Sequence, residues 1–120
     1  MAYAFADQAG AATSSGPLPP LARGQVVVLV EREDTRRVAN HADLLAGLRA
    51  SGVNARSVTL KDASFAEQVN LFRDVAVLLA PHGNANGNLL WMPPGGTLIE
   101  MFGFNYTRTF FEGIARELGV

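Results

Sequence analysis

Residues 75–102 of this 120-residue chain read VAVLLAPHGNANGNLLWMPPGGTLIEMF. The stretch opens with a continuous apolar run, Val75 to Ala80, which is typical of a strand buried on both faces of a parallel sheet. A loop rich in Asn and Gly follows from Pro81 to Asn88, and residues 93–96 form a Pro-Gly turn. The hydrophobic run from Thr97 to Phe102 predicts the next strand, so this stretch predicts two strands joined through a polar loop.

Two further strands are predicted on the N-terminal side of this stretch. Residues 25–31 form a second continuous, β-branched run, which again indicates a strand buried on both faces. Residues 53–60 form a weaker candidate, in which Val58 and Leu60 are apolar. The chain therefore carries four strand candidates.

Helices are predicted between the strands and after the last of them. One should begin near Asn40, a good N-cap residue, and stop at Gly52. Ser64 and Glu67 match a capping box, which indicates the start of a second helix. The inner stripe of a final helix is predicted to consist of Phe111, Ile114 and Leu118.

The alternation of strands and helices predicts an α/β fold, with a parallel, Rossmann-like sheet, helices on both faces and right-handed crossovers. Ligands of such sheets bind outside the carboxyl ends of the strands. We therefore expect a site formed by the loops after Glu31, after Ala80 and after Phe102.

Composition narrows the possible functions. The net charge of −1 provides no basic surface for a polyanion, so nucleic acid is not an expected partner. The absence of Cys excludes disulfides, zinc-thiolate sites and thiol catalysis, and two His residues are too few for a histidine-only metal site. The sequence has no apolar stretch long enough to span a membrane and no signal-peptide pattern.

The chain divides into two parts by composition. Residues 1–24 are rich in Ala, Ser, Gly and Pro, which predicts a disordered or linker-like leader. Residues 25–120 are predicted to form the ordered domain.

Two of the polar residues in the predicted loops and strands are candidates for binding or catalysis. His82 follows a buried strand directly, where it could donate to a diphosphate, transfer a proton, or serve as a hydrogen-bonded structural residue. Glu100 lies near the carboxyl end of an apolar strand, where it could bind ribose hydroxyls or form a structural ion pair.

Arg32, Arg36 and Arg37 follow the first strand and could neutralise a diphosphate at the same rim of the sheet. The alternative is a solvated loop in which they pair with the neighbouring acidic residues. The sequence alone favours the solvated loop.

Several motifs occur in a fixed order along the chain. His82-Gly83 precedes Asn88 to Gly95 and then Leu98-Ile99-Glu100, and a Phe-x-Glu-Gln-Val helix motif lies at residues 65–69. Upstream lie Arg32, Arg37 and Asn40. Together these motifs cover roughly residues 26–102 and resemble glycosyltransferase family 61. Its signature runs His-Gly-Ala-Gly-Leu-Thr-Asn, then an apolar stretch with Met and Pro-Gly, then a strand ending in Glu.

The resemblance implies a GT-B architecture of two Rossmann-like halves, with this chain supplying the C-terminal, donor-binding half. It implies an inverting transfer from a UDP-sugar to a hydroxyl of a glycan or protein acceptor, in the Golgi or endoplasmic reticulum lumen. The expected partners are the UDP-sugar, the acceptor and an N-terminal half of the enzyme. No metal or other cofactor is expected, which fits the absence of an Asp-x-Asp motif.

The resemblance also implies roles for particular residues. Arg32 and Arg37 would hold the diphosphate, His82 would be the catalytic residue at the leaving oxygen, and Glu100 would bind the ribose. The remaining positions predicted to bind the nucleotide sugar are Asn40, Gly83, Asn84 and Asn88.

One departure from the signature supports a different function. Asn84-Ala85-Asn86-Gly87 stands where the family has Ala-Gly-Leu-Thr, which moves the second glycine of the loop. The alternative hypothesis is therefore a non-catalytic module of the same fold, which binds a nucleotide weakly or serves in protein interaction. The transferase hypothesis fails if His82 and Glu100 point to different faces of the sheet.

Overall fold

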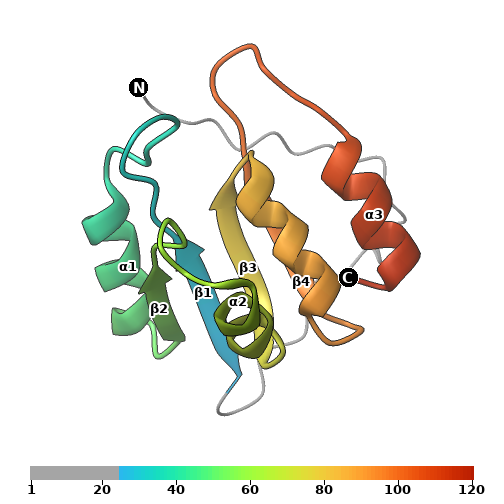
Figure 1. Ribbon diagram of the computed structural model, residues 1–120. Helices are drawn as coiled ribbons and strands as arrows, with labels where there is room; N and C mark the ends of the chain where they lie inside the picture. The colour runs from blue at the N-terminus through green and yellow to red at the C-terminus, as the bar shows by residue number, and fades with distance from the viewer. Residues whose placement is uncertain (1–24) are drawn as a thin grey trace, which may run out of the picture.

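The computed structural model of the protein describes residues 25–120, so the leader predicted at 1–24 lies outside the described residues. Strands and helices alternate along the chain, with one 3₁₀ helix, η1, before the last strand (Figure 1). In chain order they are β1 (Val26–Val30), α1 (His41–Ala50), β2 (Asn54–Val58), α2 (Phe65–Phe72), β3 (Val75–Pro81), η1 (Asn84–Trp91), β4 (Thr97–Met101) and α3 (Phe110–Leu118).

The four strands form one parallel sheet in the order β2-β1-β3-β4. After β2 the chain crosses over β1 to form β3 on its other side, so the direction of sheet growth reverses between β1 and β3. The carboxyl ends of all four strands lie along one edge, from which the loop after β4 projects in Figure 1. The predicted parallel sheet is confirmed, and its order creates a switch point between β1 and β3, where such folds bind ligands.

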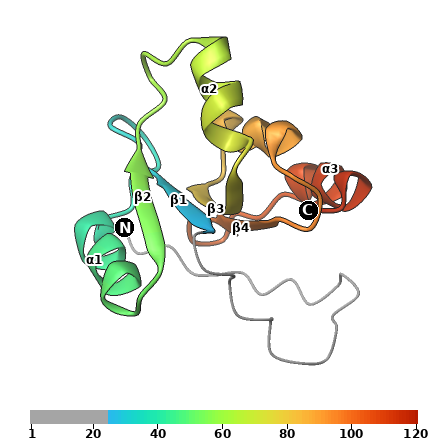
Figure 2. The same ribbon diagram turned by 90° about the horizontal axis from the view of Figure 1, so that it is seen from below.

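Helices cover both faces of the sheet, as predicted. Figure 2 shows α1 on one side and α2, η1 and α3 on the other. Leu79 of β3 packs under α1 with Leu29 and Met101, whereas Leu78 belongs to the larger cluster beneath α2, η1 and α3. Because successive strand residues point to opposite faces, both faces of β3 must be apolar, which explains its continuous hydrophobic run.

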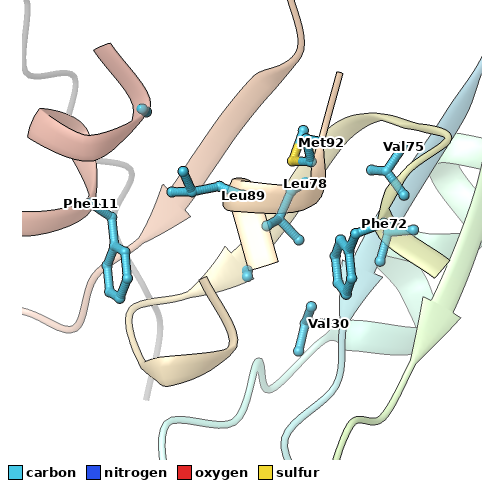
Figure 3. Packing of buried hydrophobic residues seen from close by; sticks show 10 residues of the cluster. Val30, Phe72, Val75, Leu78, Leu89, Met92 and Phe111 are labelled. Atoms are coloured by element: carbon cyan, nitrogen blue, oxygen red, sulfur yellow. The ribbon is translucent and has the colours of Figure 1, made fainter. Parts of the chain in front are cut away.

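The larger cluster contains most of the core. Phe72 at the end of α2 is fully buried and lies near Val30 and Val75, and Leu89 of η1 packs over β3 (Figure 3). Phe111 joins this cluster from α3. The α2, η1 and α3 layer is therefore fixed to the sheet by apolar contacts from each of its three helices.

The helix starts predicted at Asn40 and Ser64 are confirmed, and the capping side chain forms hydrogen bonds only at Ser64. At α2, the Ser64 hydroxyl accepts from the Glu67 backbone N–H at 3.2 Å, and the Glu67 carboxylate accepts from the Ser64 N–H at 2.7 Å. This is the predicted capping box. Asn40 is the N-cap residue of α1, as predicted, although its side chain makes no capping hydrogen bond. Gly52 follows α1 with φ +86°, the left-handed conformation that glycine favours.

Two other predictions from the sequence need correction. The loop predicted over 81–88 and the apolar run after it are in fact joined in η1, Asn84–Trp91, because the buried Asn86 and Asn88 side chains bond to distant residues. On α3 the buried residues are Phe111 and Ala115, while Leu118 is 37% exposed. The chain turns at Gly119, in a left-handed conformation, so that Val120 packs against the core.

Candidate functional site

A buried histidine–carboxylate pair lies at the carboxyl ends of β3 and β4. The Nδ1 atom of His82 lies 2.5 Å from Oε1 of Glu100, and the two side chains are only 14% and 9% exposed. The same oxygen accepts a hydrogen bond of 2.9 Å from the Asn86 side-chain amide. His82 and Glu100 thus point to the same face, so the condition under which the transferase hypothesis fails is not met.

The backbone positions this pair. The N–H of His82 donates to the carbonyl of Met101 at 2.8 Å, which continues the pairing of β3 with β4 by one residue. Glu100 lies two residues after Leu98, so its side chain points to the face covered by η1 and α3. The neighbouring strands therefore hold the two side chains together.

Aromatic rings enclose the imidazole. The His82 ring stacks on Phe102 with a centroid distance of 5.3 Å, and the rings of Tyr106 and Phe111 each lie 5.6 Å from it. Because an ionised carboxylate can only accept, the proton of a neutral His82 must lie on Nδ1. Within residues 25–120, Nε2 of His82 makes no hydrogen bond, so this nitrogen remains available for a ligand.

Two arginines from the loop after β1 reach the same backbone segment. Arg36, which has φ 55°, donates from its guanidinium to the carbonyl of His82 at 2.6 Å. The Arg32 guanidinium lies directly against Gly83, where a Cβ atom would overlap it. Gly83 therefore allows close approach by Arg32, and positive charge lies beside the start of η1.

An open cleft of about 420 Å³ lies next to these arginines at the switch point of the sheet. Its walls come from the loops after β1 and β2, from α2 and from the start of η1. They consist of Val30, Glu31, Arg32, Glu33, Asp34, Thr59, Leu60, Lys61, Gln68, Asn84 and Ala85. The predicted loop after Glu31 contributes strongly, but the loop after Phe102 does not contribute, and the loop after β2 was not predicted.

Both signs of charge line the cleft. The Lys61 ammonium lies 3.6 Å from the Glu33 carboxylate, and the Arg32 guanidinium lies 3.6 Å from that of Asp34. Hydrogen bonds from the backbone N–H groups of Thr35 and of Asp34 itself, together with Arg32, hold the pKa of the Asp34 carboxyl below its usual range. The carboxylates therefore partly offset the positive charge at this edge of the sheet.

Five of the eight residues predicted from the sequence to form the site lie at the cleft or beside it. Arg32 and Asn84 line the cleft, and His82, Gly83 and Glu100 lie at the neighbouring histidine–carboxylate pair.

The Asn88 side chain is buried and makes two hydrogen bonds within the fold. Its Nδ2 atom donates at 3.0 Å both to Gln68 and to the carbonyl of Ala85, which ties η1 to α2. Arg37 and Asn40 are exposed, and their side chains make no hydrogen bond or ion pair with the residues that the structure describes.

Sequence reasoning assigned no site role to Asn86 and Gln68, and it named Arg36 only as one of three arginines at this edge of the sheet. Asn86 lies in the stretch that departs from the family signature, and that departure was the available signal. Gln68 belongs to the helix motif, although its place in the cleft wall depends on how α2 packs. Arg36 has a left-handed backbone, and its guanidinium contacts the carbonyl of His82, which the sequence did not indicate.

Residues 25–120 contain no cluster of three or more His, Cys, Asp or Glu side chains that could hold a metal ion. None of the helices in this range has the length and hydropathy needed to cross a membrane.

The parallel sheet and the polar site at its carboxyl edge define a Rossmann-like α/β domain. The sequence pattern of the family described as Glycosyltransferase 61 matches residues 8–99. The chain belongs to this family.

Curated relatives agree with that assignment at low identity. The chain is 30% identical over 81 residues to "Protein O-linked-mannose beta-1,4-N-acetylglucosaminyltransferase 2" of Tetraodon nigroviridis, a match that covers 67% of this chain and 14% of the relative. The protein of the same name from Xenopus tropicalis is 32% identical over 77 residues, 63% of this chain and 13% of the relative. The protein of that name from Homo sapiens is 29% identical over 79 residues, a match that covers 65% of this chain and 14% of the relative. The chain thus matches about one seventh of the length of these relatives.

Proposed function

We propose that this chain is part of the donor-binding half of an inverting glycosyltransferase with a GT-B architecture. It would act on a UDP-sugar and transfer the sugar to a hydroxyl group of a glycan or protein. The observation that carries the proposal is that His82, Glu100 and two arginines meet at the carboxyl edge of a Rossmann-like sheet. Family membership and relatives whose names describe N-acetylglucosaminyl transfer support it.

The chemistry of such a transfer fits these groups. The acceptor oxygen forms a bond to the anomeric carbon of the sugar, and the bond from that carbon to the β-phosphate oxygen breaks. Negative charge therefore develops on the departing UDP, and fixed positive groups and N–H donors beside it lower the barrier. Arg32 is one such group beside Gly83, and Arg37, at the end of the same loop, would reach the diphosphate when the donor is bound.

In this proposal His82 is the catalytic residue. With its Nδ1 proton directed at Glu100, Nε2 would face the diphosphate and, when protonated, would donate to the leaving oxygen. Glu100 would keep the ring oriented, as carboxylates do beside other functional histidines. Ribose binding by Glu100 and nucleotide-sugar binding by Asn40, Gly83, Asn84 and Asn88 belong to the same proposal. The base that activates the acceptor would lie in the N-terminal half.

Two further parts of the proposal follow from the family resemblance. The donor is a UDP-sugar and the reaction needs no resident metal or other cofactor. The full-length protein would act in the lumen of the Golgi or endoplasmic reticulum, as expected for an enzyme that modifies secretory glycans or proteins.

An NMR titration of the chain with UDP, using GDP as the control nucleotide, tests this function. We expect saturable shifts with UDP alone, centred on the residues after β1 and β3. Folded His82→Ala and Glu100→Ala variants should lose these shifts. A well-folded chain that shows no shifts with UDP would contradict the proposal and would favour a non-catalytic module.

A further inference from the structure

Asn86 has no role in the function proposed above, yet it is the most deeply buried polar residue of the site. Its side chain is fully inaccessible to solvent. Its Nδ2 atom donates at 2.9 Å to Oε1 of Glu100, the same oxygen that lies 2.5 Å from Nδ1 of His82. Two donors from different elements therefore converge on one carboxylate oxygen.

The fold does not need an amide at this position. The Oδ1 atom of Asn86 is buried and has no hydrogen-bond partner among residues 25–120, which is unfavourable for folding. Leucine has the same number of side-chain heavy atoms, also branched at Cγ, and would avoid that penalty in a helix in which Leu89 already belongs to the core. Among the described residues, the Asn86 side chain makes one hydrogen bond, from Nδ2 to Glu100. Its buried, unpaired carbonyl oxygen is the unfavourable consequence of having an amide there to make that bond.

The orientation of the amide follows from its partner. If the side chain were flipped, Oδ1 would face the Glu100 carboxylate, and two acceptors would repel each other. With Nδ2 in place, the carboxylate cannot rotate without losing its hydrogen bonds to both Asn86 and His82. Without Asn86, one bond to His82 remains and the carboxylate is free to turn about it.

We propose that Asn86 is a positioning residue, which fixes the Glu100 carboxylate and thereby holds the His82 proton on Nδ1 and Nε2 toward the ligand. The effect on the histidine is independent of any ligand. The consequence for nucleotide binding rests on the function proposed above.

The test uses ¹⁵N spectra of the histidine rings of the 120-residue chain, recorded at a pH at which both histidines are neutral, together with UDP titrations. We expect one set of His82 signals with the proton on Nδ1. In Asn86→Leu, these signals should move or broaden as the proton redistributes between the ring nitrogens. UDP should bind about tenfold more weakly, by analogy with the loss found when the hydrogen-bond partner of a metal-binding histidine is removed.

His41 provides an internal reference in the same spectra. Its Nε2 atom pairs with the Ser57 hydroxyl at 2.7 Å on the α1 side of the sheet, so its signals should stay unchanged in Asn86→Leu. Met92→Ala is the matched control, because Met92 is buried at the end of η1 and belongs to the core. It should lower the unfolding midpoint and leave the His82 signals unchanged.

The proposal is overturned if Asn86→Leu leaves the His82 signals as in the wild type, or if Met92→Ala alters them equally. If Asn86→Leu does not fold, the smaller Asn86→Ala variant is judged by the same two criteria. A wild-type chain that binds no UDP would refute the function but not the positioning role, because the ring signals still report the effect of Asn86 on His82.

Discussion

At the scale of single residues, the position of the positive charge at the site depends on the lack of a side chain at Gly83 as well as on Arg32 itself. Gly83 lies under the Arg32 guanidinium, and a β-carbon at this position would overlap its terminal nitrogen. The Gly83 backbone is extended, with φ 164°, so glycine is needed here for space and not for a left-handed conformation. The position of Arg32 is thus linked to the size of residue 83.

Gly83→Ala should therefore displace Arg32 and weaken UDP binding several-fold, with little loss of stability, because the atom that must move is the end of a flexible side chain. UDP titration and thermal unfolding of the variant measure the two effects. Gly47→Ala on α1, where a β-carbon meets nothing within 4 Å, is the control for the general effect of replacing glycine. Equal UDP affinity of Gly83→Ala and the wild type would contradict the expected position of Arg32.

At the scale of elements, the start of α2 is fixed by local chemistry. Ser64→Ala removes the hydroxyl that accepts from the Glu67 N–H and should lower the free energy of unfolding by about 1 kcal/mol. Chemical denaturation with circular dichroism measures the change. Ser51→Ala at the end of α1 is a control for Ser replacement, since its hydroxyl only donates to carbonyls of the last turn.

The same capping box predicts a pH dependence. Hydrogen bonds from the Ser64 side chain and then from its backbone N–H hold the pKa of Glu67 below its ordinary value of 4.5. A carboxyl whose pKa is lower in the folded state stabilises the fold at pH values above its unfolded pKa. That contribution is lost as the pH falls through the folded-state pKa.

Glu67→Gln should therefore reduce the loss of stability below about pH 4.5 and reduce stability at neutral pH. Denaturation curves of the variant and the wild type at a series of pH values provide the comparison. Parallel pH profiles would show that this carboxyl does not contribute.

At the scale of the whole molecule, stability is concentrated in the cluster that joins the sheet to α2, η1 and α3. Phe72 is fully buried there, at the carboxyl end of α2. Phe72→Ala should lower the free energy of unfolding by about 3–5 kcal/mol, a large part of the stability of a small domain. Leu90→Ala, at a side chain that is 52% exposed, should change it by less than about 1 kcal/mol.

Denaturant unfolding of both variants tests this distribution of stability. If Phe72→Ala were as stable as Leu90→Ala, the larger cluster would not be the main core. Leu90 is a suitable reference because it lies in η1, is half-exposed and does not belong to the larger core cluster.

The sequence by itself determined the strands and the order in which they alternate with helices. Continuous apolar runs such as Val75 to Ala80 are stable in water only when both faces are covered, so their hydrophobicity already implies a buried parallel strand. The capping box at Ser64 was equally clear, because both partners lie within one turn of each other. The histidine and glutamate of the site could also be named, since His82 follows such a strand and Glu100 lies near the end of one.

Only the tertiary structure decided how the polar residues are used. Asn86 and Asn88 lie two positions apart, yet one binds Glu100 and the other Gln68, residues 14 and 20 positions away in the chain. Arg36, and not its neighbour Arg37, contacts His82, and its backbone has a left-handed conformation that no sequence pattern indicated. Strands and caps follow from hydrophobicity and from hydrogen bonds between near neighbours. The directions of side chains at the site depend on contacts between elements that meet only when the sheet has formed.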